Sequence, residues 1–401
     1  MARDIIIGLD VGTSAVKIMV AENQPSRNVS HNDPNSSLNE LHILAAVQKP
    51  SAGLRRGYVT DPEATAEAIK NAVKEAERIS NVAIKHAYIA IDGIKLEASR
   101  MKSTVMVSRA DGEVSENDIK RALTQAENNL GSLANRSIIH RIPIFYKIDG
   151  EIILGQAIGT KGEKLEADVL FVTCLNQHLD GLVKSMEIAD IAIDDIIAEP
   201  LAASYASLNK RQKEVGAVLI DIGSETTSMI VFEEGNILSL AVFPFGSTHI
   251  TNDIALGLRI SLEEAEQLKF GYISDNQKKK LSDIIEARLD DIFELIENHL
   301  KKIGRSGLLP AGAVLIGGGA NLADIENFAE KTLKLPIKVG TPVVPLKIHD
   351  KQIANPKWLT ALGLCILGAT GSLDLEAENK TNRRNFQFRQ SFFRWLKSFL
   401  P

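Results

Sequence analysis

The stretch Ile5-Ile6-Ile7-Gly8-Leu9-Asp10-Val11-Gly12-Thr13 has a counterpart in the second half of the chain, Val218-Leu219-Ile220-Asp221-Ile222-Gly223-Ser224. In both, an apolar run precedes an aspartate, a glycine and a hydroxyl residue, and a second strand-like run follows at 15–20 and 226–232. This pattern predicts a β-hairpin whose tip can hold a phosphate, because glycine lets backbone N–H groups approach an anion and the hydroxyl can donate to it. The aspartate would face a metal ion or an ordered water. One such motif is a weak signal, since Asp and Gly commonly form ordinary turns. Its repetition predicts two related lobes that enclose one polyphosphate.

Composition limits the class of protein. A chain of 401 residues is too long for one simple core, so two or more subdomains are expected. With 44% apolar and 24% charged residues, it has the composition of an ordinary soluble globular protein. The formal net charge of −5 argues against a dedicated nucleic-acid binder, so no nucleic-acid partner is expected. Cys174 and Cys365 lie in apolar runs, which indicates buried thiols in a reducing compartment.

The sequence pattern does not predict a secretory signal peptide or a membrane-spanning segment. Asp4 and Asp10 come too early for a secretory signal peptide. Away from the C-terminal tail, the most continuous apolar stretch is 359–369, which is much shorter than the roughly 20 residues that cross a bilayer. The expectation is a cytosolic protein or one peripheral on the inner face of a membrane.

Strand and helix patterns alternate along most of the chain, which predicts α/β architecture with mixed sheets. Asp61-Pro62 is expected to open a helix, and the Asn-, Ser- and Pro-rich stretch 24–40 is expected to be a loop. Between about residues 85 and 164, strands at 86–91 and 103–108, a helix from Ser115 to about Leu130, and a hairpin of 137–148 with 151–158 predict an inserted α+β subdomain. Buried strands at 168–175 and 313–316 and helices at 179–188, 262–270 and 277–303 are expected outside it.

Three further constellations could carry chemistry. Gly317, Gly318 and Gly319 come between a buried strand and a helix expected at 322–332. A single glycine there would be explained by a tight turn, but three in succession favour a ligand lying against the backbone and the helix N-terminus. Glu199, just before Pro200, could orient a water for attack on a γ-phosphate, or could be a solvated or dipole-stabilising acid near a helix start. Glu266 and Lys269 could contact a ribose or form an exposed ion pair.

Taken together, these residues resemble the actin/hexokinase/heat-shock-chaperone ATPase superfamily. Its two phosphate loops match 8–17 and 218–234, its connecting segments match 195–204 and 360–364, and its adenosine motif matches 314–325, all in the family's order. The resemblance implies a two-lobed fold of duplicated mixed-sheet, ribonuclease-H-like lobes that binds ATP with Mg²⁺. It implies that Asp10 and Asp221 hold the metal through waters, and that Glu199, with Asp221, serves catalysis by positioning the attacking water. The implied cofactor-binding residues are Gly12, Thr13, Ser14, Lys17, Gly223, Ser224, Glu225, Thr226, Gly246, Glu266, Lys269, Gly317, Gly318, Gly319 and Asn321. One departure is Ser247, where relatives commonly have a second glycine.

The C-terminal tail differs in texture from the rest of the chain. Residues 379–401 include basic residues but no acidic ones, together with many aromatic residues. At helical spacing, the apolar members form a stripe beside the cations, which is typical of a helix lying on an anionic membrane surface. The alternative is a helix docked on the protein's own core. The expected membrane-binding residues are Phe392, Phe393, Arg394, Trp395, Leu396, Lys397, Phe399 and Leu400.

An actin-like ATPase with such an insertion and tail resembles the FtsA family of bacterial cell-division proteins. The stretches 57–61, 164–168 and 249–255 also look like that family. The resemblance implies filaments of the protein itself on the cytoplasmic face of the inner membrane at the division site. It also implies capture of the C-terminal tail of FtsZ, contacts with other division proteins, and at most slow ATP turnover. The rivals are a PilM-like actin homologue that organises a pilus or secretion machine, and a small-molecule kinase, for which no acceptor-site aspartate is evident.

The expected domain boundaries follow from this resemblance. The first lobe would comprise 1–84, 165–205 and 345–372, with the inserted subdomain at 85–164. The second lobe would comprise 206–258 and 305–344, with a helical subdomain at 259–304. A flexible linker at 373–385 would lead to an amphipathic helix at 386–401.

Overall fold

The structure, a computed structural model, describes residues 4–24, 40–131, 133–153, 155–270, 275–344, 346–347 and 351–370. The tail and the predicted linker, from residue 371 onward, lie outside the described residues, as does most of the predicted loop at 24–40. Of the residues described, none belongs to a helix that combines the length and the apolar character needed to span a bilayer.

The first lobe is built on a mixed sheet of order β11-β6-β1-β2-β3-β17. Its strands are β1 (Ile5–Val11), β2 (Ala15–Gln24), β3 (Glu40–Pro50), β6 (His86–Ile91), β11 (Ala192–Ala198) and β17 (Leu346–Lys347). β1 and β2 form the predicted antiparallel hairpin, with Asp10 opposite Lys17. β1, β6 and β11 run parallel to one another, so their carboxyl ends meet at one edge of the sheet.

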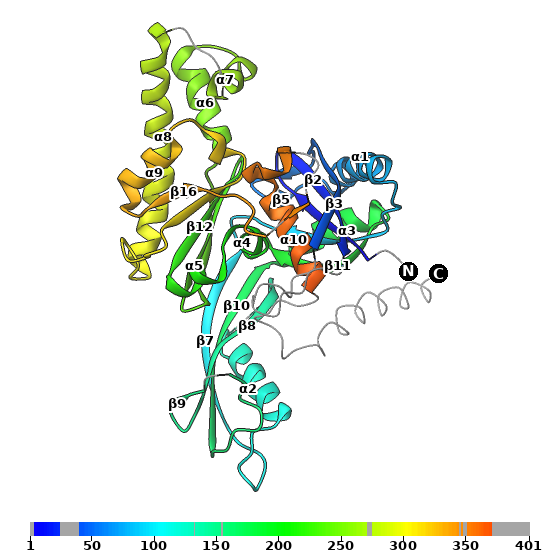
Figure 1. The fold of residues 1–401 in the computed structure, drawn as a ribbon, viewed down its shortest axis with the longest axis vertical. Coiled ribbons are helices and arrows are strands. Elements are labelled where there is room, and N and C mark those ends of the chain that lie inside the picture. The colour runs from blue at the N-terminus through cyan, green and yellow to red at the C-terminus, as the bar shows by residue number, and fades with distance from the viewer. Residues whose placement is uncertain are drawn as a thin grey trace.

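Helices cover both faces of this sheet (Figure 1), which explains why β1 is buried along nearly its whole length. α1 (Pro62–Ser80) and α3 (Asn176–Ile188) pack together on one side, and α4 (Glu199–Ser207) and α10 (Leu359–Thr370) on the other. α1 begins where predicted, because the Asp61 carboxylate accepts hydrogen bonds from the N–H groups of Glu63 and Ala64. Near α3 lies a small sheet of β4 (Leu54–Arg55) and β5 (Tyr58–Val59).

The second lobe repeats the hairpin. Its sheet has the order β14-β13-β12-β15-β16. The strands are β12 (Ala217–Ile222), β13 (Thr227–Glu233), β14 (Asn236–Phe243), β15 (Ala313–Ile316) and β16 (Ile337–Val339). The helices of this lobe are α5 (Lys210–Val215), α6 (Ser247–Leu258), α7 (Leu262–Phe270), α8 (Asp275–Lys302) and α9 (Ile325–Leu333). α4 also contacts β12 and β13, so it packs between the two sheets and joins the lobes.

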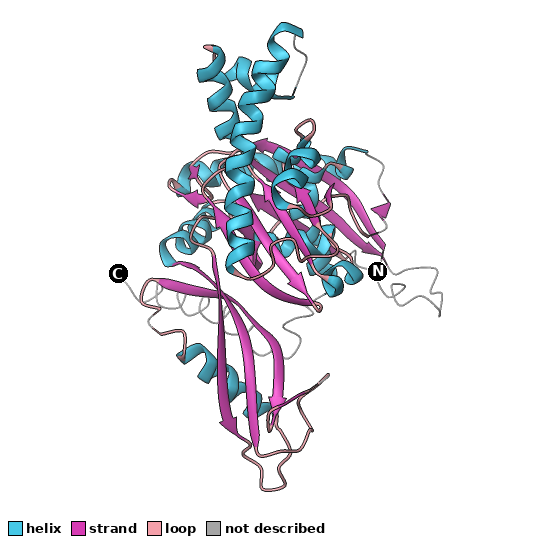
Figure 2. Cartoon of the chain, turned by 90° about the vertical axis from the view of Figure 1, so that its left-hand side faces the viewer, coloured by secondary structure: helices cyan, strands magenta, loops and turns pink. Residues whose placement is uncertain are grey.

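The inserted subdomain is a separate sheet of order β7-β10-β8-β9 with α2 packed on it. Its elements are β7 (Glu97–Met106), α2 (Glu116–Asn128), β8 (Arg136–Ile148), β9 (Glu151–Ile152) and β10 (Lys164–Leu175). Its long strands project away from the two lobes (Figure 2). α2 begins where predicted, and Ser115 and Asp118 form a capping box at its start.

Several predicted boundaries differ from those observed. β6 belongs to the sheet of the first lobe, and β10 pairs with β7 and β8, so the strands of the insertion span 97–175 instead of 85–164. The predicted strand 151–158 ends at Ile152, because the chain turns through positive φ at Gly155 and Gly159. The helix expected from residue 322 begins at Ile325, since Asp324 has a φ of 57° and no helix can pass through it. The three glycines therefore lead into a single 3₁₀ turn, Gly319–Asn321, and not directly into an α-helix.

Candidate functional site

A pocket lies between the two lobes, at the carboxyl ends of the parallel strands. In the first sheet, Asp10 is the penultimate residue of β1, and Asp92 and Glu199 directly follow β6 and β11. In the second sheet, Asp221 is the penultimate residue of β12, and Gly317 directly follows the parallel strand β15. This edge of an open α/β sheet is the usual place for a ligand. The pocket is lined by Asp10, Val11, Gly12, Thr13, Ser14, Ala15, Lys17, Gln48, Gly57, Ala90, Asp92, Glu199, Asp221, Gly223, Ser224, Thr226, Ser228, Ser247, Glu266, Phe270, Gly317, Gly318, Lys357 and Thr360.

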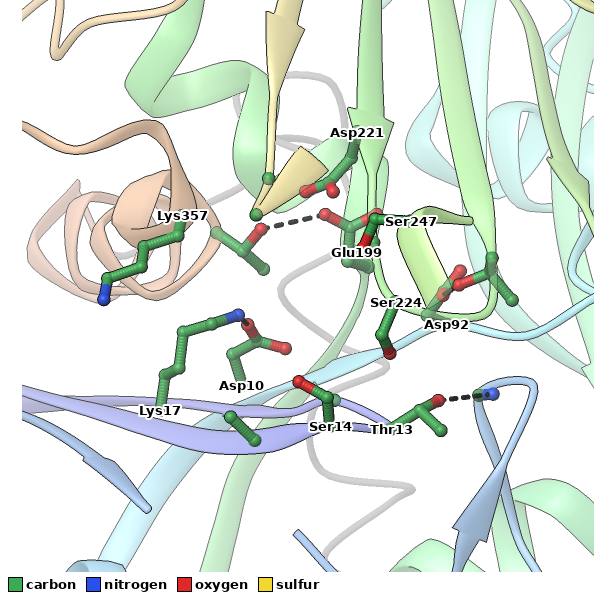
Figure 3. Close-up of a pocket in the computed structure, with 18 of the residues that line it drawn as sticks. Asp10, Thr13, Ser14, Lys17, Asp92, Glu199, Asp221, Ser224, Ser247 and Lys357 are labelled. Atoms are coloured by element: carbon green, nitrogen blue, oxygen red, sulfur yellow. Dashed lines mark hydrogen bonds and ion pairs between the residues drawn. The ribbon is translucent and has the colours of Figure 1, made fainter. Parts of the chain in front are cut away.

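The two hairpins face each other across this pocket, as the repeated motif predicts. Figure 3 shows Asp10, Thr13 and Ser14 on one side of the gap and Asp221 and Ser224 on the other. Each tip has the same backbone hydrogen bond, from Gly12 N–H to the Ala15 carbonyl in the first and from Gly223 N–H to the Thr226 carbonyl in the second. The tertiary fold thus brings together two turns that are distant in sequence.

The first hairpin holds a partly buried ion pair. Lys17 Nζ lies 2.6 Å from Asp10 Oδ2. Burial alone would lower the pKa of Lys17, but the charge and hydrogen bond of Asp10 outweigh it and the pKa is raised. Thr13 Oγ1 accepts a 3.0 Å hydrogen bond from Gly57 N–H, which leaves the hydroxyl proton of Thr13 free to donate into the pocket.

The second hairpin is supported by the start of α6. Ser247 N–H donates to the Gly223 carbonyl at 2.9 Å, and Thr248 N–H donates to the Ser224 carbonyl at 2.8 Å. A Cβ at Gly246 would lie 2.6 Å from the Ser224 carbonyl oxygen, so glycine is required there. Ser247 makes its hydrogen bond through the backbone and lines the pocket, so a second glycine is not needed for this contact.

Glu199 is buried in the pocket wall at the start of α4, which excludes the solvated alternative. Its carboxyl accepts hydrogen bonds from Ser228 Oγ at 2.5 Å and from Thr360 Oγ1 at 2.8 Å. Burial and the nearby charges of Asp221 and Asp92 raise its pKa well above the ordinary value. The raised pKa favours a protonated carboxyl, which can orient a water but is a poor base.

Some residues predicted to bind the cofactor do not line the pocket. Lys269 is buried, and its Nζ donates to Thr251 Oγ1 and Glu266 Oε2, both at 2.7 Å, and to the Ser247 carbonyl at 3.2 Å. Burial lowers its pKa, against the effect of Glu266. The ion pair of the alternative interpretation therefore does form, with the carboxylate of Glu266 exposed at the pocket and the ammonium group of Lys269 buried, where it supports the start of α6.

Three more residues that were predicted to bind the cofactor do not line the pocket and instead contact neighbouring segments: Glu225, Asn321 and Gly319. Glu225 accepts a 2.5 Å hydrogen bond from Arg56 N–H in the first lobe, and so links the lobes beside the pocket. Asn321 donates to the Gly318 carbonyl at 3.1 Å and pairs with Asn355. Gly319 packs against Ile222, where a Cβ would lie 2.4 Å from the Ile222 side chain.

Sequence reasoning missed Asp92, Ser228 and Lys357, all of which line the pocket. For Asp92 a signal existed, because the run His86–Ile91 leads into Asp92-Gly93, much as the apolar runs of the two hairpins lead into an aspartate and then a glycine. The position of Lys357, in the 3₁₀ turn Pro356–Trp358, follows no local motif.

The residues present fit a nucleotide phosphate with a magnesium ion. At Gly318, a Cβ would meet no described atom of the protein within 4 Å, so this part of the wall is open backbone that a ligand can approach. The pocket supplies carboxylate and hydroxyl oxygens, which Mg²⁺ prefers. Within the described ranges, however, no group of three or more His, Cys, Asp or Glu side chains could enclose an ion. Mg²⁺ in proteins is usually held by one or two carboxylates together with waters and ligand phosphates, and the carboxylates of Asp10 and Asp221 could serve in this way.

Comparison with known proteins gives a consistent family. The sequence matches the family model for cell division protein FtsA over residues 218–363 and that for the SHS2 domain inserted in FtsA over 97–173. It is 30% identical over 387 residues to cell division protein FtsA of Pseudomonas aeruginosa, covering 91% of this chain and 89% of the relative. It is also 30% identical over 390 residues to that of Borreliella burgdorferi, covering 91% of each chain.

Solved structures agree on the fold. A chain of the PilM–PilN type IV pilus biogenesis complex superimposes with a TM-score of 0.66 at 19% identity, covering 91% of this chain and 98% of that one. Ethanolamine utilization protein EutJ from Carboxydothermus hydrogenoformans gives 0.52 at 16% identity, covering 91% and 90%. The predicted actin-like, two-lobed α/β fold with an inserted subdomain is confirmed. On the evidence of its sequence matches over both lobes and the insertion, the chain belongs to the FtsA family of cell division proteins.

Proposed function

We propose that the chain binds ATP with Mg²⁺ between its two lobes. The observation that carries this proposal is the pair of matching hairpin tips on opposite walls of one pocket. Thr13, Ser14, Ser224 and Thr226 would donate to the phosphates, and Gly317 and Gly318 would lie against the nucleoside. Asp10 and Asp221 would hold the cation through waters, and the cation would neutralise phosphate charge. Glu199 would orient a water, with slow turnover.

The nucleotide would act as a structural switch for assembly. By contacting both hairpins, it would favour the closed arrangement of the lobes, which is the arrangement that stacks head to tail into filaments. Membership of the FtsA family of cell division proteins supports this role. The filaments would act at the septum together with other division proteins.

The tail would attach the filament to the cytoplasmic face of the cell membrane. Residues 386–401 place Phe392, Trp395 and Leu396 beside Arg394 and Lys397, a pattern that suits anionic lipid. One short amphipathic segment binds a membrane weakly, but a filament sums many such contacts. FtsZ filaments would be captured at the division site through their C-terminal tails.

Vesicle sedimentation tests the tether. The full chain, with ATP and Mg²⁺, is expected to sediment with vesicles that contain anionic lipid and to recruit FtsZ to them. A chain ending at Asn379 should stay in the supernatant. A full chain with Trp395→Glu is the matched control, since it keeps the length and the cations but not the apolar contact. Equal sedimentation of all three would refute the membrane role. Sedimentation without FtsZ recruitment would favour a PilM-like assembly role.

A further inference from the structure

Asp92 lies in the pocket without a role in the function proposed above. It follows β6, whose parallel neighbours are β1, with Asp10 near its end, and β11, which Glu199 follows. In Figure 3, Asp92 lies near Ser224, across the gap from Asp10 and Lys17. It is therefore a carboxylate of the first lobe placed at the phosphate loop of the second.

The two oxygens of this carboxylate have different surroundings. Oδ2 accepts a 2.8 Å hydrogen bond from Thr226 Oγ1, across the boundary between the lobes. Oδ1 is shielded from solvent and has no hydrogen-bond partner among the described residues. A buried oxygen without a partner is costly, and a carboxylate that served only to hold Thr226 would not need to leave one. The free oxygen belongs to a residue that lines the ligand pocket.

The backbone of Asp92 is fixed from behind. His178 Nε2 lies 2.5 Å from the Asp92 carbonyl oxygen, so this nitrogen carries the proton and donates it. The ring of His178 packs against Tyr58, with ring centroids 4.6 Å apart. A change in the side chain of Asp92 can therefore be read as a change in charge at a fixed position.

Thr226 makes Asp92 relevant to the ligand. In the proposed function, the Thr226 hydroxyl donates a hydrogen bond to a phosphate. This hydroxyl has only one proton, however, and in the structure it donates that proton to Asp92 Oδ2. Burial, together with the charges of Asp221 and Asp10, raises the pKa of Asp92 to about 6, so it remains largely ionised at neutral pH. An arriving phosphate thus meets a negative charge and a competing acceptor.

We propose that Asp92 makes polyphosphate binding in this pocket dependent on a divalent cation. The inference rests on the proposed function, since it concerns the same pocket. Without a cation, Asp92 repels the phosphates and retains the Thr226 hydroxyl. With a cation, the positive charge offsets the repulsion, and Thr226 is released to the phosphate. Asp92 is thus a specificity-determining residue that favours the metal complex of the nucleotide over the free nucleotide.

Equilibrium binding of mant-ATP to the full chain, in Mg²⁺ and in EDTA, tests this. Asp92→Asn keeps an acceptor for Thr226 and removes the charge. It is expected to tighten binding in EDTA about tenfold, because it removes one negative charge that lies near the phosphates and is partly screened by solvent. Binding in Mg²⁺ should change little, so the ratio of the two dissociation constants falls about tenfold. Asp92→Ser, a smaller neutral variant, should give the same fall.

Asp194→Asn is the matched control, because it removes the same charge from β11 at a carboxylate that pairs with exposed His86 at 2.6 Å. Its ratio should equal that of the wild type. An unchanged ratio in both Asp92 variants would overturn this inference alone. Loss of binding in Mg²⁺ by both would overturn it too, because Asp92 would then be a ligand of the cation. A wild-type chain that binds mant-ATP in neither condition would overturn the proposed function together with this inference.

Discussion

His140 of the inserted subdomain accepts a 2.9 Å hydrogen bond at Nε2 from the backbone N–H of Ala198, the residue before Glu199. Both residues are buried. The bond joins β8, a strand of the insertion, to the start of the helix that carries a pocket carboxyl. Because an acceptor nitrogen carries no proton, the imidazole must be neutral with its proton on Nδ1. The insertion is thus in direct contact with the pocket wall.

Replacing His140 should therefore destabilise the fold. In His140→Phe, the Ala198 N–H loses its acceptor in a buried place, at a cost of about 1–3 kcal/mol. Urea unfolding should show a lower midpoint for this variant. His140→Gln retains an acceptor and should lose less. If Phe and Gln were equally tolerated, the hydrogen bond would not contribute to stability.

The buried imidazole of His178 predicts a pH dependence of stability. Burial lowers its pKa to about 4, so the folded protein resists protonation at this site, whereas the unfolded chain takes up a proton near pH 6.5. Its contribution to stability is therefore fully present above pH 6.5 and is lost as the pH falls towards 4. The loss reaches up to about 3 kcal/mol.

His178→Gln provides the comparison, because glutamine can donate to the Asp92 carbonyl but does not titrate. The free energy of unfolding of the wild type should fall relative to this variant between pH 7 and pH 4.5. Parallel profiles of the two proteins would show that His178 does not titrate differently in the folded and unfolded states. Other acid-titrating groups, Asp92 among them, are present in both proteins and cancel in the difference.

Gly363 allows α10 to pack closely on α4. A Cβ at this position would lie 1.9 Å from the Ala202 carbonyl oxygen, so Gly363→Ala must push the two helices apart. The predicted cost is about 1–3 kcal/mol, although alanine favours helix formation. Thermal unfolding should show a lower midpoint. An unchanged midpoint would mean that the helices are not held this closely.

Gly318 provides the opposite case on the pocket wall. Its added Cβ would meet no described atom within 4 Å, and the φ of −64° suits any residue. Gly318→Ala should therefore unfold at the wild-type temperature, while its methyl group displaces the proposed nucleotide. Calorimetric titration with Mg-ATP should show an affinity weakened about tenfold or more. A tenfold change corresponds to about 1.4 kcal/mol of binding free energy lost with the close contact. Wild-type affinity would show that no ligand contacts this glycine.

The sequence predicted the elements that depend on neighbours in the chain. The hairpin at Asp10 and the repeat at Asp221 formed as expected, because alternating burial and a tight glycine turn are local properties. The start of α1 at Pro62 was predicted equally well from its cap. Prediction failed for the start of α9, where the positive φ of Asp324 has no distinct sequence signature. The roles assigned to individual pocket residues remain predictions.

The sequence alone thus determined two hairpins with the same Asp-x-Gly turn, their order and the family of the chain, because hydrogen bonding within a turn and apolar alternation along a strand act over a few residues. Only the tertiary structure decided which polar groups meet between the hairpins. Asp92 and Thr226 are 134 residues apart, and their hydrogen bond depends on how α4 packs between the two sheets. Side-chain contacts between lobes follow from that packing, and no local pattern encodes them.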